Sequence, residues 1–120
     1  MPYGWELIMD LKNCDVSTFT EEGIESFCKE LCKVVDMKAQ DFHIWASDPS
    51  DYDSEPDHIY GVSAVQFIVT SSITIHALHK LKAVYINLFT CKSFDPEDAR
   101  ECITDYFRGE IVSAHILERL

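Results

Sequence analysis

Four side chains that can carry out chemistry lie between positions 63 and 91 of the chain: two hydroxyls, an imidazole and a thiol. Ser71 and His76 are five residues apart in one extended segment, with Ser63 in the segment before it and Cys91 ending the segment after it. A serine hydroxyl becomes a nucleophile when a base accepts its proton, and a thiol can return a proton to a reacting atom. The four groups can therefore converge at one edge of a sheet, and their convergence is the expectation on which a catalytic role depends. The spacing alone favours the simpler interpretation, in which they are a turn serine, a sheet histidine and a buried thiol.

The segments that would position these groups show the apolar runs and alternation typical of strands. The segment 82–90 is apolar on both faces, which favours a central strand. Thr70 and Ser71 form a short junction between two of the segments. Strands are predicted at residues 5–11, 41–46, 60–69, 72–78, 82–90 and 110–117.

Two helices are predicted from capping residues and apolar periodicity. In the first, residues 20–36, Thr20 is a typical N-cap, and apolar side chains recur at spacings of three and four. The second begins at Asp95, which is followed by a first-turn proline, and is expected to end at Gly109. The order of elements predicts an α+β two-layer sandwich, in which two helices cover one face of a mostly antiparallel sheet. Residues 1–120 are expected to form a single domain, and an apolar second face of the sheet would require a partner, so we expect a homodimer.

The composition limits the classes of partner. The chain has 21 acidic and 10 basic residues and a net charge of −11, which argues against nucleic acid and anionic membranes. No signal peptide and no apolar run of about 20 residues is present, so we expect a cytoplasmic protein. The five cysteines are interpreted as reduced thiols. Cys28 and Cys32 lie on the apolar stripe of the first helix and are read as core residues.

Residues 47–58 differ from the rest of the chain because acidic, serine and proline residues predominate. Such a segment buries little apolar surface, which predicts a solvated and weakly ordered loop. Its carboxylates lack the spacing and glycine of an EF-hand loop, so no metal site is expected.

The segment from residue 61 to residue 91 resembles the bacterial and archaeal S-adenosylmethionine decarboxylases. That family carries Gly-Val-Ser-Gly, then Glu-Ser-His-hydrophobic-Ser-Ile-His-Thr-Trp-Pro-Glu, then Asp-hydrophobic-Phe-Thr-Cys. The intervals agree without gaps from Ser63 to Cys91, and the resemblance covers nearly the whole chain apart from 47–58, which looks inserted. It is carried by Gly61-Val62-Ser63-Ala64, Ser71, Ile73-Thr74-Ile75-His76, Leu88-Phe89-Thr90-Cys91, Asn13-Cys14-Asp15 and Asp95-Pro96.

The resemblance implies a pyruvoyl-dependent decarboxylase that cuts its own chain between Thr70 and Ser71. The Ser71 hydroxyl would attack the Thr70 carbonyl to form an ester, helped by a hydrogen bond from Ser63. His76 would act as the base that eliminates the ester, which leaves a pyruvoyl group at position 71. This group would form a Schiff base with the substrate amine and take up the electrons released by decarboxylation. Cys91 would then return a proton to the substrate carbon.

The chain departs from the family pattern close to these residues. Thr70 stands where the family has Glu, and residues 77–80 replace Thr-Trp-Pro-Glu. In the family the Trp helps to stack adenine and the Glu binds the ribose, so Leu78 and Lys80 occupy the implied substrate-binding positions. The resemblance implies S-adenosylmethionine as substrate and a place in polyamine (spermidine) biosynthesis. The alternatives are an unprocessed, non-catalytic paralogue with a binding or regulatory role, and a decarboxylase of another amino acid such as arginine or ornithine.

Overall fold

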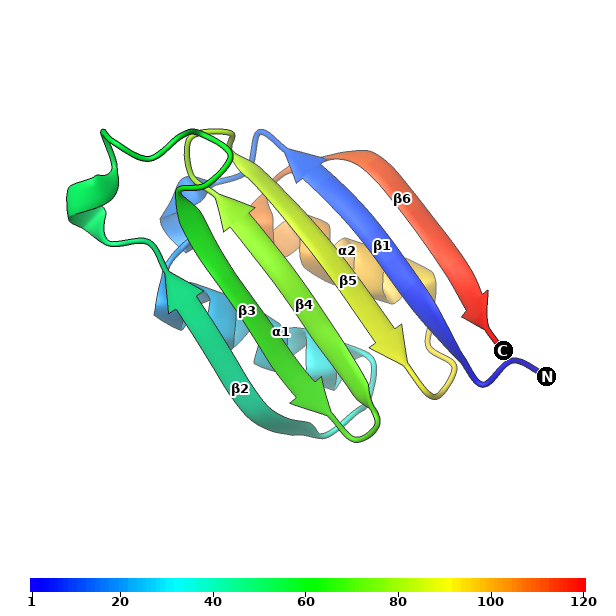
Figure 1. The fold of residues 1–120 in the computed structure, drawn as a ribbon. Coiled ribbons are helices and arrows are strands. Elements are labelled where there is room, and N and C mark those ends of the chain that lie inside the picture. Colours follow the sequence, from blue (N-terminus) through cyan, green and yellow to red (C-terminus); the bar gives the residue numbers. More distant parts are fainter.

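The computed structural model describes residues 1–120 and contains one six-stranded antiparallel sheet with two helices across one face (Figure 1). The order of strands across the sheet is β2-β3-β4-β5-β1-β6. The predicted α+β two-layer sandwich is confirmed, and β5 has a neighbour on each side, as its apolar faces indicate. The strands are β1 (Gly4–Lys12), β2 (Ala39–Ala46), β3 (Gly61–Ile68), β4 (Ser71–Leu78), β5 (Ala83–Thr90) and β6 (Glu110–Arg119), and the helices are α1 (Glu21–Val34) and α2 (Pro96–Phe107).

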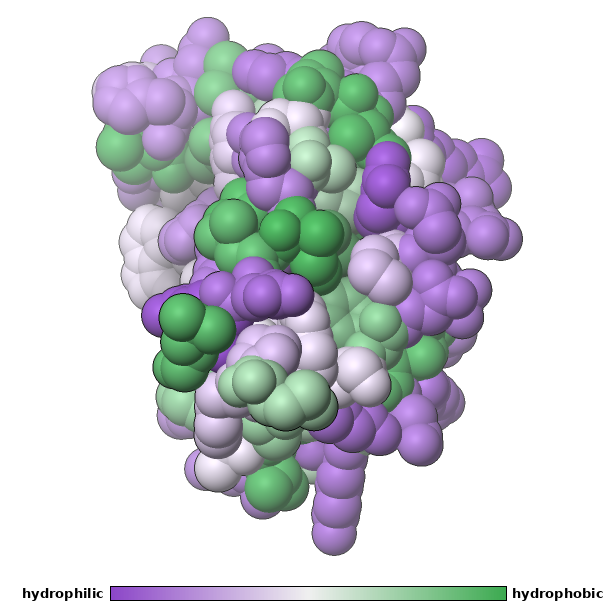
Figure 2. Space-filling model, turned by 90° about the vertical axis from the view of Figure 1, so that its right-hand side faces the viewer, coloured by the Kyte–Doolittle hydropathy of each residue, from purple (hydrophilic) through white to green (hydrophobic).

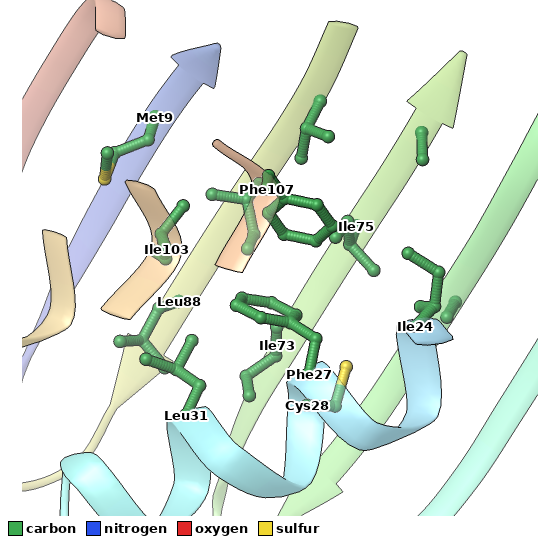
Figure 3. Close-up of a cluster of buried hydrophobic side chains, with 14 of the residues drawn as sticks. Met9, Ile24, Phe27, Cys28, Leu31, Ile73, Ile75, Leu88, Ile103 and Phe107 are labelled. Atoms are coloured by element: carbon green, nitrogen blue, oxygen red, sulfur yellow. The ribbon is translucent and has the colours of Figure 1, made fainter. Parts of the chain in front are cut away.

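The hydrophobic core lies between the helices and the sheet (Figure 3). Side chains alternate between the two faces of each strand, so in β4 Ile73 and Ile75 point into the core while His76 is exposed. Phe27 of α1 and Phe107 of α2 pack against each other, with ring centroids 4.7 Å apart. The face of the sheet opposite the helices is left uncovered, and we call it the open face.

The helix starts agree with the predicted caps. The Thr20 hydroxyl accepts the backbone N–H of Gly23, and the Asp95 carboxylate accepts that of Glu97. The end of α2 differs from the prediction, because Arg108 and not Gly109 adopts the left-handed conformation (φ 51°). Gly109 is required for space instead, since a Cβ there would lie 2.6 Å from the Cys14 sulfur.

The acidic segment 47–58 is largely exposed, as predicted, but it is more firmly attached than its composition indicates. Residues Pro49–Asp51 form a 3₁₀ turn, and the Asp48 carboxylate accepts the backbone N–H of Ser50. The Lys80 ammonium donates to the carbonyl of Glu55 at 2.8 Å and lies 4.7 Å from the centre of the Tyr52 ring. These contacts join the loop to the β4–β5 turn, and local composition does not indicate them. No group of three or more His, Cys, Asp or Glu side chains is placed to hold a metal ion.

His79 occupies the centre of this attachment. Its ring lies edge-on to Phe19 and Tyr60, with centroid separations of 5.5 and 5.1 Å. Nε2 is 2.9 Å from the Phe19 carbonyl oxygen, so we assign the N–H to Nε2. Nδ1 is buried without a hydrogen-bond partner, and burial lowers the pKa of His79. A protonated ring would therefore place a charge where no acceptor exists.

We expect the free energy of unfolding to fall more steeply with acid in the wild type than in His79→Gln. The histidine has a lower pKa in the folded chain than in the unfolded chain, so the unfolded chain binds the proton more readily. The stabilisation is complete above the unfolded pKa of about 6.5 and is lost as the pH falls towards the folded value. Urea unfolding of both proteins at pH 7.5 and 5.5 measures the loss of stability in each. The carboxylates contribute to both proteins, so the difference between the two losses belongs to His79. Equal losses in the two proteins would contradict the assignment.

The edge strand β6 carries apolar side chains that remain in contact with solvent. Ile111, Val112, Ile116 and Leu117 are 38% to 57% exposed, and Figure 2 shows apolar surface among hydrophilic residues on this side of the molecule. Ile116 pairs with the buried Leu7, so its side chain is on the helix side of the sheet. No helix is long and apolar enough to cross a membrane.

Candidate active site

The Thr70–Ser71 bond lies in a tight hairpin turn between β3 and β4. Ile68 pairs directly with Ser71, which leaves Val69 and Thr70 as the turn. Thr70 has a φ of 47°, in the left-handed region that glycine and asparagine favour. It is the only β-branched residue among the non-glycine residues with positive φ, the others being Asn13, Asp36, Lys82 and Arg108. The bond predicted to be cut therefore follows a residue with backbone strain.

Cys91 lies beside this turn, directly after β5. Its backbone N–H donates to the Ser71 hydroxyl oxygen at 2.9 Å, and the Thr70 hydroxyl donates to its sulfur at 3.2 Å. The hydroxyls of Thr70 and Ser71 lower the pKa of Cys91. This environment gives the thiol more thiolate character than an ordinary cysteine has.

The other four thiols lack this character because burial raises the pKa of each. The pKa of Cys28 rises to about 12, and those of Cys14 and Cys102 to about 11. Cys32 is shifted in the same direction, and both it and Cys28 are buried in α1, as predicted. All five cysteines are free thiols.

Ser63 and His76 form a second pair on the open face of the sheet. They are cross-strand partners in β3 and β4, and the Ser63 hydroxyl oxygen is 2.7 Å from Nδ1 of the ring. Trp45 pairs with Ser63 on one side and Tyr85 pairs with His76 on the other. These residues make a row of polar and aromatic groups across the open face.

The expectation that all four groups converge within the chain is wrong. Ser71 and His76 are five residues apart along β4, a span of about 16 Å at about 3.3 Å per residue. An odd separation also places the two side chains on opposite faces, and Ser71 is only 7% exposed while His76 is exposed. The structure brings Ser71 together with Cys91, and Ser63 together with His76, as two separate pairs.

The two predicted substrate-binding positions have different surroundings. Leu78 lies on the open face two residues beyond His76, opposite Gly61. Lys80 follows β4 and is engaged by the acidic loop through Glu55 and Tyr52. Leu78 is thus associated with the Ser63–His76 pair, whereas Lys80 helps to hold the loop.

One feature of the site was missed in the sequence, namely the contact between the Thr70 side chain and Cys91. The resemblance assigned Thr70 only a carbonyl group. The pairing of Ser72 with Phe89 places Thr70 opposite Cys91 across the β4–β5 ladder, which positions its hydroxyl at the sulfur. The signal in the sequence is the short junction between the predicted strands 72–78 and 82–90, because a short turn fixes the register between the two strands that it joins.

The arrangement of layers and strands is that of a known class of decarboxylase. The structure is similar to the crystal structure of the adenosylmethionine decarboxylase from Aquifex aeolicus VF5, with a TM-score of 0.78 and 19% sequence identity over 98% of this chain and 91% of that one. At this identity the likeness establishes the fold.

The family follows from the sequence itself. The family described as S-adenosylmethionine decarboxylase matches residues 5–120, so the chain belongs to this family. The predicted family is confirmed. No curated protein gives a significant match.

Proposed function

We propose that the protein is a pyruvoyl-dependent decarboxylase of S-adenosylmethionine, serving polyamine (spermidine) biosynthesis, and that it makes its own prosthetic group by cleavage between Thr70 and Ser71. The observation that carries the proposal is the strained turn at Thr70, which presents the Ser71 hydroxyl and the Cys91 thiol together. These residues fit a group derived from Ser71, because the hydroxyl, the preceding carbonyl and a proton donor all come from adjacent strands. A pyruvoyl group at this position would supply the electron sink for decarboxylation.

Self-cleavage requires two steps at these residues. In the first, the Ser71 oxygen forms a bond to the Thr70 carbonyl carbon, the C–N bond breaks, and the Ser71 nitrogen becomes a free amine. In the second, a base removes the α-proton of residue 71 and the bond from Cβ to oxygen breaks, which releases the carboxylate of Thr70. Water then adds to the α-carbon of residue 71, and the nitrogen on that carbon leaves as ammonia, so that a ketone remains. We assign the removal of the proton to His76 and assistance in the first step to Ser63.

His76 and Ser63 cannot reach Ser71 within one chain, so the proposal includes a homodimer. Two sheets that pack by their open faces would bring the Ser63–His76 pair of one chain to the Thr70–Ser71 turn and Cys91 of the other. There His76 would act on the backbone α-proton of residue 71 and not on the buried Ser71 side chain. The open face has the apolar surface for such a contact. Trp45 and Phe67 are 59% and 47% exposed there. The His43 ring contacts the Phe67 ring, and the Tyr3 ring contacts the Phe89 ring.

The remaining roles follow from position. Cys91 would donate a proton to the substrate carbon, and its lowered pKa makes it a stronger acid than an ordinary thiol. Leu78, on the same face as His76, is the better placed of the two substrate-binding candidates. The net charge of −11 suits S-adenosylmethionine, which carries a sulfonium charge.

Intact mass spectrometry of the purified full chain tests the proposal. We expect fragments 1–70 and 71–120, with the second lighter by one ammonia than a fragment that begins with serine. A single full-length mass after long incubation would contradict the proposal and favour the unprocessed, non-catalytic alternative.

The substrate is identified by reductive trapping. The cleaved protein is treated with cyanoborohydride and S-adenosylmethionine, arginine or ornithine in separate reactions, and the mass of fragment 71–120 is measured. We expect an adduct with S-adenosylmethionine. An adduct with arginine or ornithine alone would reassign the substrate.

A further inference from the structure

The hydroxyl of Thr70 has two acceptors within reach. Its oxygen is 2.9 Å from the Val69 carbonyl oxygen and 3.2 Å from the Cys91 sulfur. A hydroxyl has one proton and can serve only one acceptor at a time. The sulfur is in turn 3.7 Å from the same Val69 oxygen, so a protonated thiol also has an acceptor there.

We propose that Thr70 is a positioning residue, whose hydroxyl holds the Cys91 sulfur beside the 70–71 bond and stabilises its thiolate; the proposal rests on the proposed function. When the sulfur is protonated, its S–H faces the Val69 carbonyl. When the sulfur is a thiolate, the Thr70 hydroxyl turns from that carbonyl to the sulfur. The turn thus accommodates both protonation states without movement of the backbone.

The backbone of Thr70 supports a role for its side chain. Glycine and asparagine are favoured at a left-handed position of a two-residue hairpin, whereas a β-branched residue such as Thr70 is strained there. Such strain is typical of positions where the surrounding structure uses the side chain. Here the strained conformation brings the Thr70 hydroxyl to the sulfur.

Few charges compete with the hydroxyls for control of the thiol. The turn contributes Val69, Thr70 and Ser71, none of which is charged. From β1 the nearest neighbour is the backbone of Gly4, where an added Cβ would lie 3.2 Å from Cα of Cys91. Lys92, next in the chain, also favours the thiolate, but its ammonium binds the carbonyl and carboxylate of Asp36.

Alkylation of Cys91 by iodoacetamide, followed by peptide mass spectrometry over a range of pH, measures the thiolate directly. Thr70→Val keeps the shape and the β-branch but removes the hydroxyl, and Thr70→Ser keeps the hydroxyl. We expect Thr70→Val to slow alkylation near neutral pH by about fivefold to tenfold and to move the profile to higher pH. Thr70→Ser should resemble the wild type. Lys92→Gln separates the effect of charge and should cause a smaller shift than Thr70→Val.

The rate of cleavage provides a second measurement on the same proteins. We expect Thr70→Val and Thr70→Ser to split at similar rates, because the two cleavage steps use Ser71, Ser63 and His76 and not the thiol. A change in the alkylation profile then reports on the contact between Thr70 and Cys91 alone. An alkylation profile of Thr70→Val that matches the wild type would overturn the inference. If the wild-type chain stays whole while Thr70→Val still shifts the profile, the contact between Thr70 and Cys91 stands and the proposed function fails.

Discussion

Chains carrying Ser71→Ala and chains carrying His76→Ala should each remain uncut alone, whereas their co-expression should yield cleaved His76→Ala chains. The first variant lacks the nucleophile and the second lacks the base. In a mixed dimer, the Thr70–Ser71 turn of one chain would meet the intact Ser63–His76 pair of the other. About half of the His76→Ala chains are expected to split if dimers of this symmetric kind form at random. The two full-length variants and their fragments are distinguished by intact mass.

A matched control isolates the contribution of the partner. Co-expression of His76→Ala with the double variant Ser71→Ala/His76→Ala should give no cleavage, because no chain then supplies the imidazole. Cleavage in that mixture would show that His76 is not the base. Cleavage of His76→Ala alone at the wild-type level would show the same. A mixture of the two single variants that stays whole would contradict a site shared across the open faces.

Phe67→Asp should convert the protein to a monomer and abolish its cleavage. Phe67 lies on the open face, 47% exposed, and is followed closely by the strained turn. A two-fold axis would place the new carboxylate twice in one interface, where an unpaired buried charge costs several kcal/mol. Dimerisation should weaken by about a thousandfold or more, as measured by sedimentation equilibrium.

Ile116→Asp is the matched control for this variant. Ile116 is 46% exposed, almost as much as Phe67, but it lies on the helix side of the sheet. We expect Ile116→Asp to remain dimeric and to cleave like the wild type. Loss of the dimer in Ile116→Asp with no effect of Phe67→Asp would move the interface to β6 and contradict the proposed pairing of open faces.

The secondary structure was predictable because its signals are local. Apolar alternation identified the strands, and Thr20 and Asp95 identified the helix starts that the structure confirms. The end of α2 was less predictable, because Gly109 is required by its distance from Cys14, a residue remote in sequence. Composition predicted the exposure of the acidic loop. It could not predict the attachment through Tyr52 and Lys80, since that contact joins segments 28 residues apart.

The fold class and the family could be read from the chain alone, because periodicity and motif spacing are local properties of the sequence. The sequence also contained the reason why Ser71 and His76 separate, since five residues along a strand reverse the face of the sheet. Only the tertiary structure placed the Thr70 hydroxyl at the Cys91 sulfur and Ser63 at His76. These contacts depend on the register between strands and on the backbone angles of one turn, which are fixed when the whole sheet packs against its helices.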